Sequence, residues 1–278
     1  MVINAARAGV KAIYCEKPLA RSLDEADRML VACEDRGVKL AVALQNRVAV
    51  TTRTAQRWIA EGKIGRLRAI RGYGKQDRRS GGQDLLVLGT HWLDLMRVFA
   101  GDPRWCDARV TVAGRDAIPA DLHPAEENAG LVAGDDVVAQ YGFDHGVTGT
   151  FESTRSDDGG GTPYFRVELC GTGGVIAFWS ALREPPALNF YPHPFVLPDR
   201  PAEWQVTPLD PIAPPSGVDT RLPENQLLVR DLLDAVERGR EPVCSGRDGR
   251  AALEMVLAVY ESHFCDDRVT LPLETRQC

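Results

Sequence analysis

The chain has 278 residues, of which 44% are hydrophobic and 26% charged, as is ordinary for a globular protein of one large or two smaller domains. A formal net charge of -6 argues against a nucleic-acid-binding surface, and no apolar stretch is long enough to cross a membrane. The seven cysteines show no CxxC pair, so neither a metal site nor a disulfide framework is indicated and reduced cytoplasmic thiols are expected.

The first fifty residues alternate between helix and buried strand. Residues 2–7 are expected to end a helix, and residues 10–15 to form a short strand. A second helix follows, because Ser22 and Glu25 have the spacing of a capping box and apolar residues then recur at helical period. Residues 38–44 are an apolar run of strand length. This order predicts a parallel sheet with right-handed crossovers.

From residue 48 onward the pattern changes to helices at the start and end of a run of strands. Turn residues and short strands dominate the middle, which is typical of an α+β domain with adjacent antiparallel strands. The proline-rich residues 185–223 are expected to be irregular surface chain. The expected helices are 51–62, 84–99, 224–238 and 247–263, and the expected strands are 66–75, 108–113, 136–143, 147–153, 164–170 and 175–179.

Four sequence motifs occur in a recognisable order. They are Cys15 to Ala20 (CEKPLA), Gly62 to Gly65, Gly81-Gly82 followed by Gly89 to Leu95, and Cys244 to Arg250. With these motifs the chain resembles the Gfo/Idh/MocA family of NAD(P)-dependent oxidoreductases over nearly its whole length. The resemblance implies that residues 1–47 are the C-terminal remnant of a Rossmann domain. Residues 48–278 would then form the family's α+β substrate-binding and oligomerisation domain, with a large, open, mainly antiparallel sheet.

The glycine-rich phosphate loop of a Rossmann domain does not occur in this sequence. Family members carry that loop ahead of the Glu16-Lys17-Pro18 segment, so we expect the sequence to be a fragment of the full enzyme. The resemblance implies NAD or NADP as cofactor and leaves the choice between them open. It also implies a homo-oligomer that associates through the open face of the sheet.

Lys17 and His91 are the expected catalytic residues. Lys17 follows a strand at the carboxyl edge of the parallel sheet, where open α/β sheets bind their ligands. A cation there could stabilise the alkoxide that forms while a hydroxyl loses its proton. A histidine can take that proton because its ordinary pKa of about 6.5 lies close to the working pH. In the family, the lysine that matches Lys17 contacts both substrate hydroxyl and cofactor.

The helix expected over residues 84–99 would place Asp84, Val87, His91 and Asp94 on one stripe, because they are spaced three, four and three apart. Many sugar and inositol dehydrogenases of the family carry an aspartate four residues before the histidine, where this chain has Val87. Asp84 is therefore the expected substrate-binding carboxylate, and Asp94 is expected to serve helix packing or a salt bridge.

Further candidates lie at strand ends near the expected domain junction, which are natural ligand positions. Ordinary surface polarity is the alternative interpretation of each. The candidates for the cofactor are Glu16, Lys17, Pro18, Gln45, Asn46 and Arg47, and those for the substrate are Tyr73, Lys75 and Arg78.

Three hypotheses about function remain. The first is hydride transfer between NAD(P) and a hydroxyl or keto group of a sugar, cyclitol or related polyol. The second is a non-catalytic relative that binds a sugar or a partner subunit through its sheet face, which the missing loop and Val87 would fit. The third is NAD-dependent glycoside cleavage through transient oxidation of a ring carbon.

Overall fold

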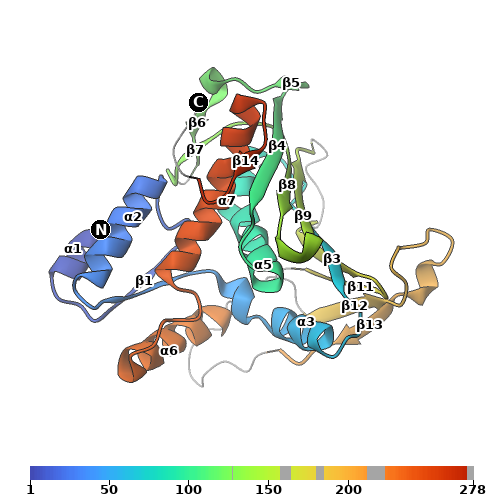
Figure 1. Ribbon diagram of the computed structural model, residues 1–278, viewed down its shortest axis with the longest axis horizontal. Helices are drawn as coiled ribbons and strands as arrows, with labels where there is room; N and C mark the ends of the chain where they lie inside the picture. The colour runs from blue at the N-terminus through green and yellow to red at the C-terminus, as the bar shows by residue number, and fades with distance from the viewer. Residues whose placement is uncertain (127, 157–163, 180–184, 212–222, 274–278) are drawn as a thin grey trace.

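The computed structural model describes residues 1–273 except residues 127, 157–163, 180–184 and 212–222 (Figure 1). A small parallel sheet comes first, formed by β1 (Ala12–Cys15) and β2 (Lys39–Val42). The connecting helix α2 (Leu23–Glu34) begins where the Ser22 side chain accepts a hydrogen bond from the Glu25 amide, as the sequence predicts. The predicted parallel arrangement is therefore confirmed.

A mixed sheet of ten strands makes up most of the remaining described chain. Its neighbours are antiparallel except for β3 and β9, which pair in parallel. Along β8 the side chains alternate between buried Val137 and Ala139 and exposed Val138 and Gln140, because only one face of the sheet is covered by helices. The strands, in their order across the sheet, are β13 (Gln205–Pro208), β12 (Ala187–Tyr191), β11 (Val175–Trp179), β10 (Arg166–Gly171), β3 (Leu67–Tyr73), β9 (Thr148–Thr154), β8 (Asp136–Gly142), β4 (Trp105–Val112) and β14 (Val269–Thr270), with β5 (Arg115–Asp116) beside β4.

The long helices join the two sheets (Figure 1). Helix α7 packs against β4 on one side and reaches α2 and β2 on the other, while α6 packs against β1 and β2. The helices are α1 (Val2–Arg7), α3 (Val50–Ala60), α4 (Gly82–Asp84), α5 (Thr90–Ala100), α6 (Pro223–Arg238) and α7 (Gly246–Cys265), with the short turns η1 (Gln45–Val48), η2 (Leu85–Gly89), η3 (Pro119–Asp121), η4 (Asp144–Gly146) and η5 (Pro201–Glu203), and a separate ribbon of β6 (His123–Pro124) and β7 (Leu131–Val132). The fold is thus the expected α/β unit followed by a large mixed sheet.

Two expectations about the chain beyond residue 185 need correction. The segment expected to be irregular contains strands β12 and β13, and Leu188 and Phe190 of β12 pack into the core. The prolines that flank them hid the pattern, and Pro208 is tolerated because β13 is an edge strand. Residues 212–222 of that segment lie outside the described residues. The expectation of reduced thiols is wrong for Cys265, which is disulfide-bonded, but it holds for the free cysteines Cys15, Cys33, Cys106, Cys170 and Cys244.

Among the described residues, no helix combines the length and the apolar character that crossing a membrane requires. In the same part of the chain, no three side chains of His, Cys, Asp or Glu gather as they would around a metal ion.

Candidate functional site

Lys17 connects the small sheet to the helical segment that carries His91. It lies two residues after β1, and its Nζ donates a hydrogen bond of 2.5 Å to the backbone oxygen of Val87. Its neighbour Glu16 is exposed and Pro18 is half-buried. The lysine is therefore directed away from its own strand and toward the segment before α5.

His91 lies in the first turn of α5 and is 3% exposed. Burial lowers its pKa from 6.5 to about 3, and the positive charge of Lys17 adds to this effect. Its Nδ1 has no hydrogen-bond partner among the described residues. Lys17 and His91 thus belong to one site, in which the imidazole is neutral at physiological pH.

The helix expected over residues 84–99 is not continuous, and this corrects the expected stripe. Residues 85–89 form the π-helix η2 between α4 and α5. A π-helical turn holds more residues than an α-helical one, so residues before it do not keep the angular relation to α5 that a regular helix would give. Gly89 allows this turn to approach the sheet, because a Cβ there would lie 2.7 Å from the ring of Phe151.

Asp84 consequently faces the ends of β3 and β9. Its Oδ2 accepts hydrogen bonds from the Lys75 amide and the Ser153 hydroxyl, both at 2.8 Å. Its Oδ1 has no hydrogen-bond partner in the described part of the chain, and burial raises the pKa of this carboxyl. The Asp84 side chain therefore links the ends of β3 and β9 through Oδ2, and Oδ1 remains available to accept a hydrogen bond.

The other three residues expected to bind the substrate differ in burial and in their contacts. Lys75 is half-buried and its pKa is lowered, first by burial and then by Arg79. Tyr73 stacks edge-on against Tyr164, with ring centroids 5.4 Å apart, and burial raises its pKa to about 12. Arg78 is exposed, so the structure does not bring it into the site.

The three candidates after β2 differ in the polar atoms that remain available. Gln45 Oε1 is buried without a hydrogen-bond partner among the described residues, and Asn46 is 5% exposed. Arg47 uses four of its five N–H groups on Asp94, Asp248 and the Val243 carbonyl. Little donor capacity is left on Arg47 for the expected contact with a cofactor.

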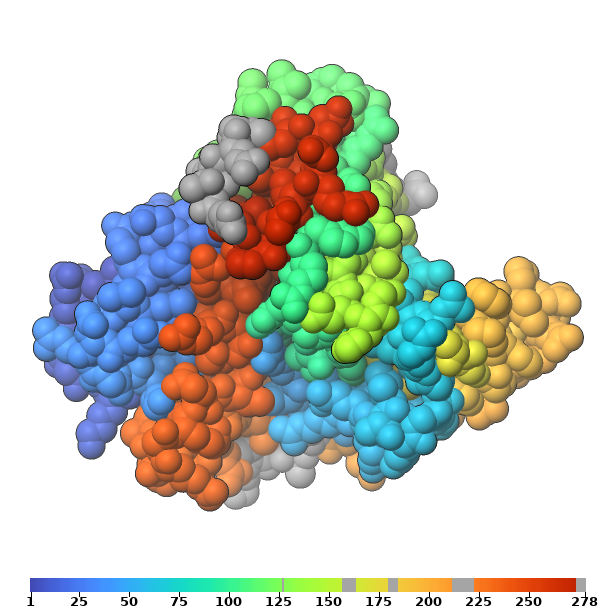
Figure 2. Space-filling model, in the orientation of Figure 1, coloured from blue at the N-terminus to red at the C-terminus, as the bar shows by residue number. Residues whose placement is uncertain are grey.

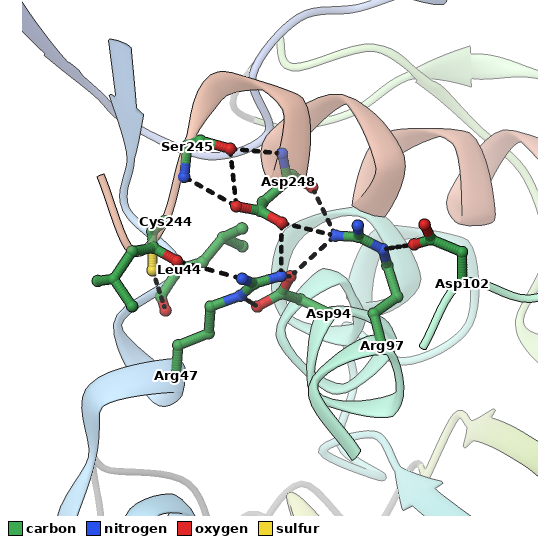
Figure 3. Close-up of polar contacts among 9 residues, drawn as sticks. Leu44, Arg47, Asp94, Arg97, Asp102, Cys244, Ser245 and Asp248 are labelled. Atoms are coloured by element: carbon green, nitrogen blue, oxygen red, sulfur yellow. Dashed lines mark hydrogen bonds and ion pairs between the residues drawn. The ribbon is translucent and has the colours of Figure 1, made fainter. Parts of the chain in front are cut away.

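Figure 3 shows the ionic cluster in which Arg47 takes part. Its members are Arg47, Asp94, Arg97 and Asp248. Asp94 forms a salt bridge, one of the two roles expected for it, while the remaining partners were not foreseen. The signals available were the i, i+3 spacing of Asp94 and Arg97 and the capping box of Ser245 and Asp248 at the start of α7.

Two family models match this chain. Residues 1–44 match the oxidoreductase family with the NAD-binding Rossmann fold. Residues 52–177 match the GFO/IDH/MocA C-terminal domain.

Individual relatives agree with these matches. Levoglucosan dehydrogenase of Pseudarthrobacter phenanthrenivorans is 31% identical over 202 residues, which are 64% of this chain and 51% of that protein. The chain thus spans about half the length of that relative. The NAD(+)-dependent scyllo-inositol 2-dehydrogenase of Bacillus subtilis is 27% identical over 275 residues, 94% of this chain and 71% of that protein. A structure of levoglucosan dehydrogenase with NADH and L-sorbose superimposes with a TM-score of 0.73 at 25% identity, over 98% of this chain and 76% of that one.

Proposed function

The chain belongs to the Gfo/Idh/MocA family of oxidoreductases, and we propose that its site transfers a hydride between NAD(P) and a hydroxyl or keto group of a sugar, cyclitol or related polyol. The observation that carries this proposal is the pairing of Lys17 with a buried, neutral His91 at the carboxyl edge of the small parallel sheet. The relatives named levoglucosan dehydrogenase and scyllo-inositol 2-dehydrogenase support the substrate class.

The residues present fit the nicotinamide end of such a cofactor. Gln45 Oε1 and His91 Nδ1 are both buried polar atoms that lack hydrogen-bond partners among the described residues, and both belong to segments at this edge. Gln45 and Asn46 would hold the nicotinamide, and Lys17 would lie beside it. When bound, the cofactor supplies the acceptor or donor of the hydride.

Lys17 and His91 divide the proton chemistry between them. The Lys17 ammonium donates a hydrogen bond to the reacting oxygen and stabilises the negative charge that develops on it. His91, neutral in the free chain, takes the hydroxyl proton at Nδ1. A pKa of about 3 makes it a weak base at first, but negative charge developing beside Lys17 offsets the lysine's effect and raises the pKa of His91 during the step.

Lys17→Ala tests this assignment. Fluorescence titrations with NADH and NADPH, and turnover on sugars and cyclitols, are measured for this chain and for a version extended upstream in the reading frame. We expect Lys17→Ala to lower kcat at least about 100-fold, as for a lost charge-stabilising group, with cofactor affinity retained. The matched control is Lys11→Ala, an exposed lysine just before β1. Unchanged turnover in Lys17→Ala would remove the lysine from the mechanism, and absence of both cofactor binding and turnover in both chain lengths would contradict the proposal.

We further propose that the open face of the large sheet forms a contact between copies of the chain. Val138 on β8 is 54% exposed on that face, although one strand position away its neighbours are fully buried. Val138→Arg should shift the sedimentation coefficient toward that of a monomer. Val31→Arg, on the exposed side of α2 at 55% exposure, is the control that should leave it unchanged. Equal sedimentation of all three proteins would refute this contact.

A further inference from the structure

The ionic cluster of Arg47, Asp94, Arg97 and Asp248 joins three segments that are distant in sequence. Arg47 belongs to η1, directly after the small sheet. Asp94 and Arg97 lie one turn apart on α5, and Asp248 lies in the first turn of α7. The cluster therefore lies where the end of the small sheet, α5 and the start of α7 meet (Figure 3).

The contact between Arg47 and Asp94 is a two-pronged ion pair. Arg47 Nε and Nη2 donate to the two carboxylate oxygens of Asp94, each at 2.7 Å. The side chain of Asp94 is 2% exposed and that of Arg47 is 14% exposed. Paired guanidinium and carboxylate forks fix direction as well as distance, so this contact restrains both the position and the rotation of α5.

The carboxylate of Asp248, at the start of α7, contacts both arginines of the cluster. Asp248 Oδ1 accepts from Arg47 Nη2 at 2.9 Å and from Arg97 Nη1 at 3.2 Å. Its Oδ2 accepts from the backbone amide and hydroxyl of Ser245 in the capping box. Arg97 also pairs with the exposed Asp102 at 2.6 Å, while the two guanidinium groups face the buried carboxylate of Asp94 and that of Asp248. Removing the charge of Arg47 or Asp94 would therefore leave another charge buried with less compensation.

The position of this ion pair relative to His91 carries the inference. Lys17 follows β1 and contacts Val87, four residues before His91. Arg47 follows β2 and contacts Asp94, three residues after His91. Because β1 and β2 are parallel, both contacts start from the same edge of the small sheet, and they bracket the histidine on either side.

We propose that the Arg47–Asp94 ion pair is a positioning device that fixes α5, and with it His91, against Lys17. This proposal rests on the function proposed above for Lys17 and His91. Arg47 acts through α5 and need not touch the substrate. Loosening the pair lets α5 move away from the sheet edge, which separates the imidazole from the lysine charge and admits water to it.

The test is the protonation of His91 in the cofactor-free chain, followed by NMR of the imidazole and assigned with His91→Gln. Arg47→Lys keeps the positive charge but cannot make the bidentate contact, and Asp94→Asn keeps the shape of the side chain but loses its negative charge. The matched control is Arg104→Lys, because Arg104 makes the same two-pronged contact with Asp144, at 2.9 and 2.7 Å, on the surface.

We expect Arg47→Lys to raise the pKa of His91 by about one unit or more, which is a roughly tenfold larger protonated fraction at pH 5. Asp94→Asn should raise it less, because the loss of a negative charge three residues from the imidazole acts in the opposite direction. Arg104→Lys should leave it unchanged. A titration of His91 in Arg47→Lys that matches the wild type, whatever happens to the melting temperature, would overturn the proposal. If Asp94→Asn does not fold, Arg47→Lys alone decides.

This measurement also separates the present inference from the proposed function. The titration of His91 needs neither cofactor nor turnover, so it can show positioning even if the protein proves to have no dehydrogenase activity. Where turnover is measurable, Arg47→Lys should lower kcat at least about tenfold with the KM for the sugar little changed, because the substrate contacts remain.

Discussion

The Lys17 ammonium lies 2.5 Å from the backbone oxygen of Val87, in the π-helix that precedes His91. A main-chain carbonyl carries only a partial charge, so it holds the lysine in place without neutralising it. Burial is the main cause of the low pKa of the His91 imidazole, and the positive charge of Lys17 lowers it further.

Val87→Asp should reverse this effect. Residue 87 contacts Lys17 through its backbone oxygen and lies four residues before His91. A carboxylate there would add negative charge to this segment, which would stabilise the imidazolium and offset the lysine charge. We expect the pKa of His91 to rise from about 3 by at least about one unit, measured by NMR titration of the imidazole. Val87→Asn, which has nearly the same shape and no charge, is the control. Equal titration of His91 in the two variants would show that the charge at residue 87 does not reach the imidazole.

The low pKa of His91 also makes the stability of the chain depend on pH. The folded pKa is about 3 and the unfolded one about 6.5, so below pH 6.5 the unfolded state binds a proton that the folded state does not. The stability that neutral His91 permits is therefore complete above pH 6.5 and lost as the pH falls toward 3. Each pH unit in this window costs about 1.4 kcal/mol at most.

Urea unfolding at pH 7, 6 and 5 measures this loss. Relative to the wild type, His91→Gln should become more stable by about 1 kcal/mol between pH 6 and 5, because glutamine does not titrate. His145→Gln, on the exposed turn η4, is measured in parallel as the control for replacing a histidine on the surface. A constant difference between His91→Gln and the wild type across the three pH values would argue against a buried neutral histidine.

The small parallel sheet could be predicted from the sequence because strand, helix and strand follow one another within the first 44 residues. Polar residues follow each of the two strands, which marks where each strand ends. The motifs that carry the family resemblance contain Lys17 and His91, and the structure places them close enough for the lysine charge to act on the imidazole. Both results depend on local patterns.

The remaining features depend on contacts that local patterns do not contain. The π-helix η2 forms where the chain fits against Phe151, which is 62 residues beyond Gly89. Arg47 forms ion pairs with Asp94 and Asp248, which are 47 and 201 residues away in the sequence. The residues next to Arg47 therefore gave no sign that it binds carboxylates of the protein instead of a cofactor. Strands β12 and β13 pair at the far edge of the sheet and were hidden by prolines.

Asp84→Asn tests the carboxyl that ties β3 to β9. Asparagine can still accept the hydrogen bonds from the Lys75 amide and the Ser153 hydroxyl, so we expect the fold to persist. Burial raises the pKa of Asp84, so its favourable contribution is complete below the unfolded pKa and is lost as the pH rises through the folded one. Asp84→Asn should therefore gain stability relative to the wild type between pH 4 and pH 7.

Urea unfolding at those two pH values checks this sign. Asp116→Asn, whose side chain is 64% exposed in a surface ion pair, is measured in parallel. A relative loss of stability in Asp84→Asn as the pH rises would mean that the carboxylate is stabilised by a cation, with Lys75 the nearest candidate.

Gly89→Ala should strain the contact between η2 and the sheet. The added Cβ would lie 2.7 Å from Cζ of Phe151, a fully buried ring, so either the ring or the turn must shift. Overpacking of this kind typically costs about 1–3 kcal/mol. Because the turn carries Val87 and leads directly into His91, a shift should also disturb the contact with Lys17. Thermal unfolding and the NMR signal of the His91 imidazole report the two effects separately.

A double-mutant cycle with Phe151→Leu locates the strain. The smaller side chain makes room for the added methyl group, so Gly89→Ala should cost less in the Phe151→Leu background than in the wild type, by about 1 kcal/mol. The close contact predicts a favourable coupling free energy because Gly89→Ala adds volume where Phe151→Leu removes it. Strictly additive effects would mean that the ring of Phe151 yields to the methyl group without cost, and that any cost of Gly89→Ala comes from another contact, such as the Asp84 carbonyl at 3.3 Å.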